Sequence, residues 1–111
     1  MNSEKIETVV RQFSDEAKQI YGPTLRQVIL FGSCARGDFS ADSDIDIMVL
    51  LDVPQEQISD ARKKMLSTAD RLDLHYDVVL TPVFQNAALY EKYLPVSKFY
   101  QNVRDEGVRY A

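Results

Sequence analysis

Residues 30–50 read LFGSCARGDFSADSDIDIMVL, and the pattern in this stretch decides the fold. An apolar run ends in a Gly-Ser pair, and ten residues later an Asp-Ile-Asp triplet opens a second apolar run. Short apolar runs bounded by turn residues predict strands, here at about 27–31 and 45–51. The second strand is apolar on both faces after its aspartates, so we expect it to lie centrally in a sheet covered on both sides.

Helical spacing of apolar residues flanks these two strands. The N-terminal segment carries its apolar residues on one stripe and ends at a Gly-Pro pair, which stops a helix. By the same criteria we expect helices over 3–21, 52–74, 81–93 and 97–107, a third strand over 74–82 and an edge strand over 108–110. This order of elements predicts an α/β sandwich, in which helices flank a small sheet, as a single domain over 1–111.

The composition excludes several classes of protein. The chain has 111 residues, 45% hydrophobic content, a net charge of −4 and a pI near 4.9. No global positive field attracts nucleic acid, so we expect no direct nucleic-acid partner. No stretch is apolar and long enough for a membrane span or a signal peptide, and the single cysteine, Cys34, allows no internal disulfide. These features indicate a soluble cytoplasmic protein.

Asp44 and Asp46 lie one residue apart, so their side chains leave the predicted strand on the same face, about 7 Å apart. Two carboxylates at the edge of an apolar core repel each other and resist desolvation, which favours a cation between them. With oxygen ligands alone, magnesium is the natural candidate. The alternative for an isolated Asp-x-Asp is two solvated acids at a strand end.

A third acid, Asp77, lies in the apolar segment LHYDVVL at 74–80. A lone carboxylate among apolar neighbours is costly unless it is paired or metal-bound. If this segment lies beside the strand of Asp44 and Asp46, three carboxylates converge, which suits a two-metal site for phosphoryl transfer. The alternative is a structural ion pair between Asp77 and an arginine.

The Gly32-Ser33 turn follows the first strand directly and is a candidate phosphate site. Gly32 allows a tight turn, and the backbone amides together with the Ser33 hydroxyl can bind phosphate oxygens. A P-loop is excluded, because Asp38 and Phe39 stand where that motif has Lys and Ser or Thr. Arg36 could contact the phosphates or face solvent.

The segment GSCARGDFSADSDID at 32–46 matches the signature of the DNA polymerase β-like nucleotidyltransferase superfamily: a Gly-Ser pair, ten residues, then Asp-x-Asp. The chain most resembles the minimal nucleotidyltransferases, which share the GSxARG and SDIDxxV motifs and carry little beyond the catalytic fold. The resemblance implies a polymerase β-like fold, a mixed sheet flanked by helices, and NMP transfer from an NTP, usually ATP. It also assigns Asp44, Asp46 and Asp77 as catalytic acids and ligands of two magnesium ions, Gly32 and Ser33 as triphosphate-binding residues, and Arg36 and Ser43 as further nucleotide contacts.

Minimal nucleotidyltransferases are commonly encoded beside HEPN proteins as toxin–antitoxin pairs. The resemblance therefore implies an antitoxin that transfers AMP from ATP to a tyrosine hydroxyl of a HEPN ribonuclease toxin, in a hetero-oligomer of the two proteins. Two alternatives stay open: a non-catalytic antitoxin that blocks its partner by binding, and a nucleotidyltransferase that acts on a small-molecule hydroxyl. In so short a chain we expect the partner to dock beside the site, at loop 34–43 or around Phe99 and Tyr100, unless these aromatics pack under the sheet.

Overall fold

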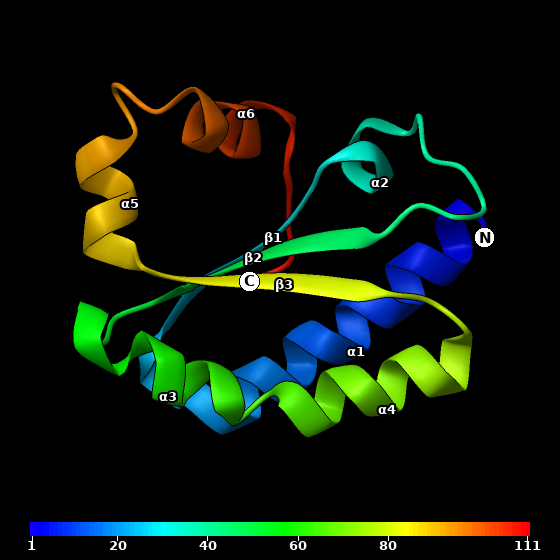
Figure 1. The fold of residues 1–111 in the computed structure, drawn as a ribbon, viewed down its shortest axis with the longest axis horizontal. Coiled ribbons are helices and arrows are strands. Elements are labelled where there is room, and N and C mark those ends of the chain that lie inside the picture. Colours follow the sequence, from blue (N-terminus) through cyan, green and yellow to red (C-terminus); the bar gives the residue numbers. More distant parts are fainter.

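The computed structural model describes residues 1–111 and is built on a four-stranded sheet with strand order β3-β2-β1-β4 (Figure 1). The strands are β1 (Leu25–Phe31), β2 (Ile45–Leu51), β3 (Leu80–Asn86) and β4 (Val108–Arg109). β2 pairs with β3 in parallel, whereas β1 pairs antiparallel with both β2 and β4. The mixed sheet agrees with the predicted fold class, and β2 lies between two strands, as its apolar sequence predicts.

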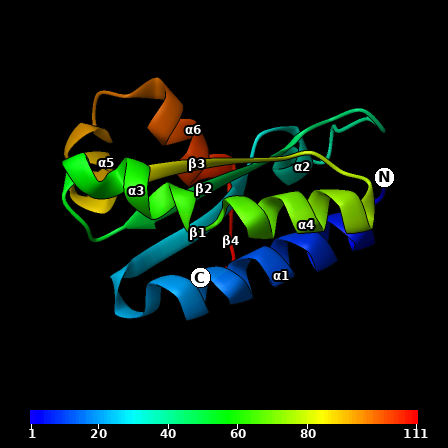
Figure 2. The ribbon, with the colours of Figure 1, turned by 60° about the horizontal axis from the view of Figure 1, so that its bottom comes forward.

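Helices cover both faces of the sheet (Figures 1 and 2). They are α1 (Ser3–Tyr21), α2 (Ser33–Arg36), α3 (Ile58–Lys63), α4 (Leu66–Tyr76), α5 (Ala87–Tyr93) and α6 (Lys98–Glu106), with the 3-10 helices η1 (Gly22–Thr24) and η2 (Gln55–Gln57). α1, α3 and α4 lie on one face, and α5 and α6 lie on the other. None of the helices combines the length and the apolar composition that crossing a bilayer requires.

The alternation of side chains along β2 divides the core between the two faces. The odd-numbered residues from Ile45 to Leu51 pack in the larger cluster, together with α1, α3 and α4. Met48 and Leu50 belong to the smaller cluster, which lies under α5 and α6. Asp46 follows the same alternation as Met48 and Leu50, so it faces the side of the sheet that α5 and α6 cover.

Most of the predicted helices are present. α1 spans the predicted range, and its N-cap is Asn2, whose side-chain oxygen accepts a hydrogen bond from the Lys5 amide (2.8 Å). α6 and β4 lie where the last helix and the edge strand are predicted. The helix predicted over 52–74 is present as three pieces, η2, α3 and α4. A turn at 64–65 separates α3 from α4, and its amides bond back three residues in the manner of a 3-10 helix.

The third strand is predicted at the wrong place, over 74–82. α4 continues into this range and closes at Asp77 in the left-handed conformation (φ 54°), so β3 begins only at Leu80. The Thr81-Pro82 pair, which predicts a helix start, lies inside β3. Proline is tolerated there because β3 is an edge strand, where one side of the backbone needs no partner. α5 therefore starts after β3 rather than at this pair.

Candidate active site

The aspartates of the Asp-Ile-Asp triplet lie at the start of β2. Asp44 is exposed just before the strand, and Asp46 is half-buried on it, in register with Phe31 of β1. Burial is the main cause that raises the pKa of Asp46; the Asp44 charge adds to the rise, and the Arg36 guanidinium opposes it. Two ionised carboxylates in this position repel each other, and a cation bound between them would relieve the repulsion. This is the arrangement expected of acids that share a metal ion.

Gly32 packs directly against the Asp46 carboxylate. Its backbone has φ 73° and ψ −158°, a combination that is open almost only to glycine. A β-carbon added to Gly32 would lie 2.4 Å from Oδ2 of Asp46, so the close approach also requires glycine. Gly32 is the N-cap of the single-turn helix α2, whose first amides, those of Ser33 and Cys34, have no partner within the helix. Such amides can donate to phosphate oxygens.

Cys34 joins α2 to the segment that carries the aspartates. Its thiol is buried and donates a weak hydrogen bond to the carbonyl oxygen of Asp44 (3.5 Å). Burial raises the pKa of the Cys34 thiol, and the charge of Asp46 adds to the effect. The side chain is therefore a packing contact that holds the glycine turn against the aspartates, and not an ionised nucleophile.

Arg36 lies at the end of α2 and is paired with two carboxylates. Its guanidinium contacts Asp38 (3.3 Å) and Glu106 of α6 (3.2 Å). Both pairs are at the surface, where ion pairs contribute little stability. Arg36 also lines a cavity together with Gly32, so its location is compatible with the predicted contact to phosphates.

The structure does not bring Asp77 into a cluster with Asp44 and Asp46. No group of three or more His, Cys, Asp or Glu side chains is arranged to hold a metal ion. Asp77 is exposed, because α4 runs through the segment that the sequence predicts as a strand and leaves this residue at the helix end. Tyr76 and Val78 beside it are half-buried and Leu80 is buried, but the Asp77 carboxylate is not, so the expected buried acid, and with it the alternative of a buried Asp–Arg pair, is wrong.

Ser43 and Asp77 border the same shallow hollow. Ser43 closes a turn, because its hydroxyl accepts a hydrogen bond from the Ser40 amide (2.8 Å). Together with Asp42, these two residues line a cavity of about 260 Å³ immediately before Asp44 in the chain. Asp77, which precedes β3, is thus next to the loop residues that come directly before Asp44.

The carboxylate pair fits magnesium without a third protein ligand. Magnesium is commonly held by one or two carboxylates, while substrate phosphates and water complete its octahedron. Asp44 and Asp46 are oxygen-only donors of this kind, and the Gly32 turn, which packs against one of them, is the place where phosphates would enter. The donor set therefore suits a magnesium–triphosphate complex.

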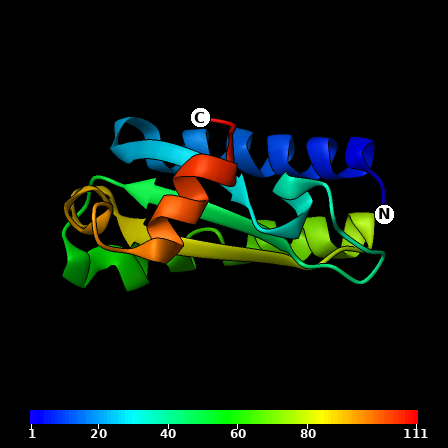
Figure 3. The same cartoon turned by 90° about the horizontal axis from the view of Figure 1, so that it is seen from above.

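α6 contributes residues that the sequence pattern did not single out. Figure 3 looks onto the side of the sheet that carries α5 and α6. It shows α6 (orange to red) crossing over the strands and α2 (teal) to its right. Asn102 and Glu106 of α6 line a cavity of about 300 Å³ with Gly32 and Arg36. Exposed Asn and Glu are typical of any surface helix, so no local signal marks them. α6 is connected to the site by the contact of Arg36 with Glu106, 70 residues further along the chain, and by the ring contact of Phe31 with Phe99.

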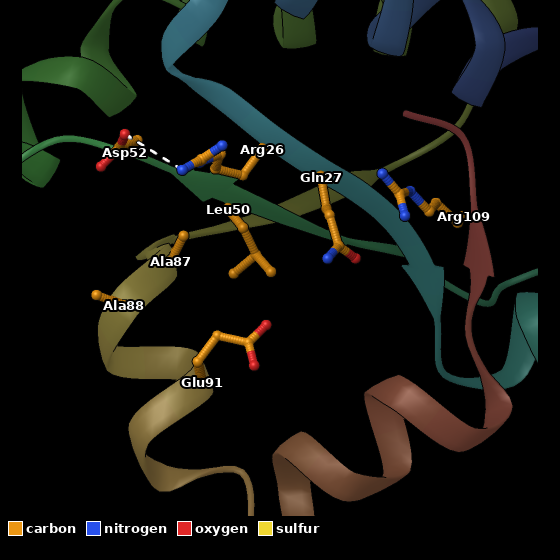
Figure 4. Close-up of a pocket in the computed structure, with 8 residues that line it drawn as sticks. All are labelled: Arg26, Gln27, Leu50, Asp52, Ala87, Ala88, Glu91 and Arg109. Carbon is orange, nitrogen blue, oxygen red and sulfur yellow. Dashed lines mark ion pairs between the residues drawn. The ribbon is translucent and has the colours of Figure 1, made fainter.

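A second cavity, of about 400 Å³, lies at the opposite end of β1 and β2, next to α5 (Figure 4). Charged groups of both signs line it, and Arg26 pairs there with Asp52 (3.6 Å). Figure 4 shows the Glu91 carboxylate pointing into the cavity from α5. It contains neither a glycine turn nor a carboxylate pair, so we place the candidate active site at Gly32 and Asp46.

Several known proteins resemble the chain over most of its length. The profile of the nucleotidyltransferase domain family matches residues 10–109. The provisionally named protein adenylyltransferase MJ0604 of Methanocaldococcus jannaschii is 36% identical over 107 residues, which cover 96% of each chain. A crystal structure of a provisionally named nucleotidyltransferase from Sulfolobus solfataricus superposes with a TM-score of 0.56 at 22% identity, over 98% of this chain and 86% of that one. A chain of the toxin–antitoxin complex MntA–HpeT superposes with a TM-score of 0.50 at 21% identity, over 100% of this chain and 73% of that one. At these identities the two superpositions establish a shared fold.

Proposed function

The chain belongs to the nucleotidyltransferase domain family and is a nucleotidyltransferase, and from this premise we propose that it transfers AMP from ATP to a tyrosine hydroxyl of a HEPN ribonuclease toxin. The relative from M. jannaschii bears the name of a protein adenylyltransferase, and one structural neighbour is a component of a toxin–antitoxin complex. Both names favour a protein acceptor over a small molecule. In this proposal the protein is the antitoxin of the pair.

The observation that carries the proposal is the close packing of Gly32 against the Asp46 carboxylate. Nucleotidyl transfer requires a phosphate chain next to acidic ligands, and this contact joins a phosphate-binding turn to such a ligand. In the proposed reaction the tyrosine oxygen bonds to the α-phosphorus, and the bond from that phosphorus to the oxygen bridging to the β-phosphate breaks. Pyrophosphate leaves, and the hydroxyl proton passes to a base.

Each residue of the site has a role in this proposal. Asp44 and Asp46 would hold magnesium, which when bound neutralises charge on the attacking and leaving oxygens. The amides at the start of α2 and the Ser33 hydroxyl bind the triphosphate at the Gly32 turn. Arg36 stands at the same turn and adds a positive charge.

We expect Ser33→Ala to weaken ATP binding by about tenfold, the cost of one hydrogen bond to a charged phosphate. The loss is limited because the backbone amides of the turn remain. Isothermal titration of ATP in magnesium buffer measures it. Ser59→Ala, which changes an exposed serine of α3 away from the site, is the matched control and should bind ATP as the wild type does. An ATP affinity that Ser33→Ala leaves unchanged would remove the hydroxyl from the phosphate site.

For Asp77 we propose a role on the acceptor side, as the base that receives the tyrosine proton. Its exposed position beside the 42–43 segment supports this role better than that of a metal ligand. Asp77→Asn should lower the rate of transfer by about a hundredfold, the lower end of the effect of a general base, and leave ATP affinity unchanged. Asparagine tolerates the left-handed backbone at this position, so the melting temperature should also stay unchanged. Single-turnover kinetics measure the rate of transfer, titration measures the ATP affinity and a thermal melt measures the stability. An unaltered rate would exclude Asp77 from the chemistry.

The two aromatics predicted to contact the partner differ in their surroundings. Tyr100 packs against Tyr90 of α5, with ring centroids 5.0 Å apart, and is only partly exposed. Phe99 is 47% exposed and lines an apolar groove with Val83 and Val96. The groove reaches the active site, because Phe99 also lines the cavity beside Gly32. We propose that the toxin docks along this groove and brings its tyrosine to the carboxylates from the groove side of Phe99, so that the cavity beside Gly32 stays free for the nucleotide.

Mass spectrometry of the co-expressed partner tests the proposed function. The toxin should carry added AMP when it is produced with the wild-type protein, and none when it is produced with Asp44→Asn. A toxin that stays unmodified but is neutralised by both proteins would replace the enzyme with an antitoxin that acts by binding. Release of pyrophosphate from ATP without label on the partner would indicate a small-molecule acceptor.

A further inference from the structure

The cavity beside the glycine turn has the composition of a nucleoside site. It measures about 300 Å³ and lies between the end of β1 and α6. Gly32 and Arg36 line it on the side of the turn, and Phe99, Asn102 and Glu106 line it on the side of α6. The volume is at the lower end of the range for small-molecule sites, which suits a part of a ligand whose remainder lies outside.

An exposed aromatic ring forms one wall of this cavity. Phe99 contacts Phe31 edge to face, with ring centroids 5.6 Å apart and an interplanar angle of 79°. Phe99 also packs against Tyr100, with ring centroids 5.7 Å apart, but its side chain is 47% exposed, so part of the ring is open to a ligand. Any of the nucleobases can stack on an aromatic ring of this kind, because every base has a π-face.

Asn102 supplies the polar group that can distinguish one base from another. It is exposed, and no hydrogen bond within the protein uses its side-chain amide, which offers one acceptor and two donors. Adenine presents an amino donor next to a ring-nitrogen acceptor, a pair that an asparagine amide matches in two hydrogen bonds. Guanine presents two acceptors at the same edge, which an asparagine cannot match in this way.

The charges along the cavity fix the direction in which a nucleotide would lie. Glu106 stands on α6 and pairs with Arg36 at 3.2 Å. A carboxylate repels phosphates but accepts hydrogen bonds from ribose hydroxyls, as acidic residues do in dinucleotide sites. The triphosphate therefore belongs at Gly32, the ribose near Glu106 and the base between Phe99 and Asn102.

We propose that this cavity is the nucleoside subsite of the donor, in which Phe99 stacks on the base and Asn102 selects adenine. This assignment rests on the proposed function, since it takes the triphosphate to lie at the Gly32 turn. It makes Asn102 the residue that determines the preference for ATP over GTP.

Titration of three ligands, ATP, GTP and inorganic tripolyphosphate, in magnesium buffer separates the subsite from the phosphate site. The wild-type protein should bind ATP more tightly than GTP, and tripolyphosphate more weakly than ATP. Asn102→Ala should weaken ATP binding by about tenfold and abolish the preference over GTP, with no effect on tripolyphosphate. Phe99→Leu should weaken ATP and GTP alike and spare tripolyphosphate, whereas Phe99→Tyr, which keeps the aromatic ring, should retain the wild-type affinities.

Asp105→Asn is the matched control, because Asp105 is exposed on the same helix but outside the cavity. It should bind all three ligands as the wild type does. If the wild type binds ATP and tripolyphosphate but both Asn102→Ala and Phe99→Leu leave the ATP affinity unchanged, the subsite is elsewhere and the proposed function stands. If the wild type binds neither ATP nor tripolyphosphate, the proposed function and the subsite fail together. Circular dichroism of each variant confirms that the fold is retained, as expected for exposed positions.

Discussion

Asp44→Asn and Asp46→Asn are each expected to lower AMP transfer by at least about a thousandfold, because each removes one of the two carboxylates that would hold magnesium beside the triphosphate. A metal ion contributes several kcal/mol to stabilising charge in such a transition state, and roughly 4 kcal/mol corresponds to three orders of magnitude in rate. The loss should appear in turnover measured at saturating ATP. Asp60→Asn, which changes an exposed acid of α3 away from the site, is the matched control and should retain the wild-type rate.

The same substitution at Asp46 should raise the melting temperature in metal-free buffer. Burial and the Asp44 charge raise the pKa of Asp46 in the folded protein. A carboxyl with a raised pKa favours folding while it is protonated, and that contribution is lost as the pH rises through its folded pKa. In its ionised form Asp46 is therefore destabilising, and the neutral amide relieves this. Normal transfer by either asparagine variant would contradict the carboxylate pair as the centre of the reaction.

The sequence predicted the parts of the site that a continuous motif encodes. The apolar run of β2 identifies a central strand, and the alternation along it places Asp46 on one face regardless of the rest of the fold. The glycine turn was predictable for the same reason, because it directly follows a strand and its residue types suit phosphate binding. For these residues the local pattern and the tertiary structure agree.

The prediction for the segment around Asp77 failed because its local pattern fits two structures. An acid followed by β-branched residues reads as a strand, yet α4 extends to Tyr76 and the acid closes it in the left-handed conformation. Thr81-Pro82 then reads as a helix start, although Pro82 is accommodated on an edge strand. Edge position is a property of the assembled sheet, so a local reading could not detect it.

The contribution of α6 was beyond a sequence reading for another reason. Asn102 and Glu106 are ordinary surface residues of an amphipathic helix until the fold brings them to the Gly32 turn. The ion pair of Glu106 with Arg36 joins residues 70 positions apart, and nothing in either local sequence specifies that pairing. In the proposed function the motif residues would supply the chemistry, while the selectivity that we infer depends on packing.

Gly32→Val is the second substitution with a large expected effect, and it should abolish detectable ATP binding and transfer. A valine cannot adopt φ 73° with ψ −158° without strain, which costs about 1–3 kcal/mol. Its β-carbon would also lie 2.4 Å from Oδ2 of Asp46, so the carboxylate or the turn must move. Gly32→Ala already introduces that atom and should lower transfer by at least about a hundredfold, since positioning errors near 1 Å have effects of that size.

Gly37→Ala separates the displacement of Asp46 from backbone strain. Gly37 also has a positive φ, 88°, but a β-carbon there would have no heavy atom within 4 Å. Its alanine variant should therefore lose stability, seen as a lower melting temperature, and keep the wild-type rate per folded molecule. Gly32→Ala should lose both stability and rate, and the difference between the two alanine variants measures what the contact with Asp46 contributes to the reaction. If the two variants transfer AMP equally well, the packing of Gly32 against Asp46 has no part in catalysis. This packing would then no longer support the proposed function.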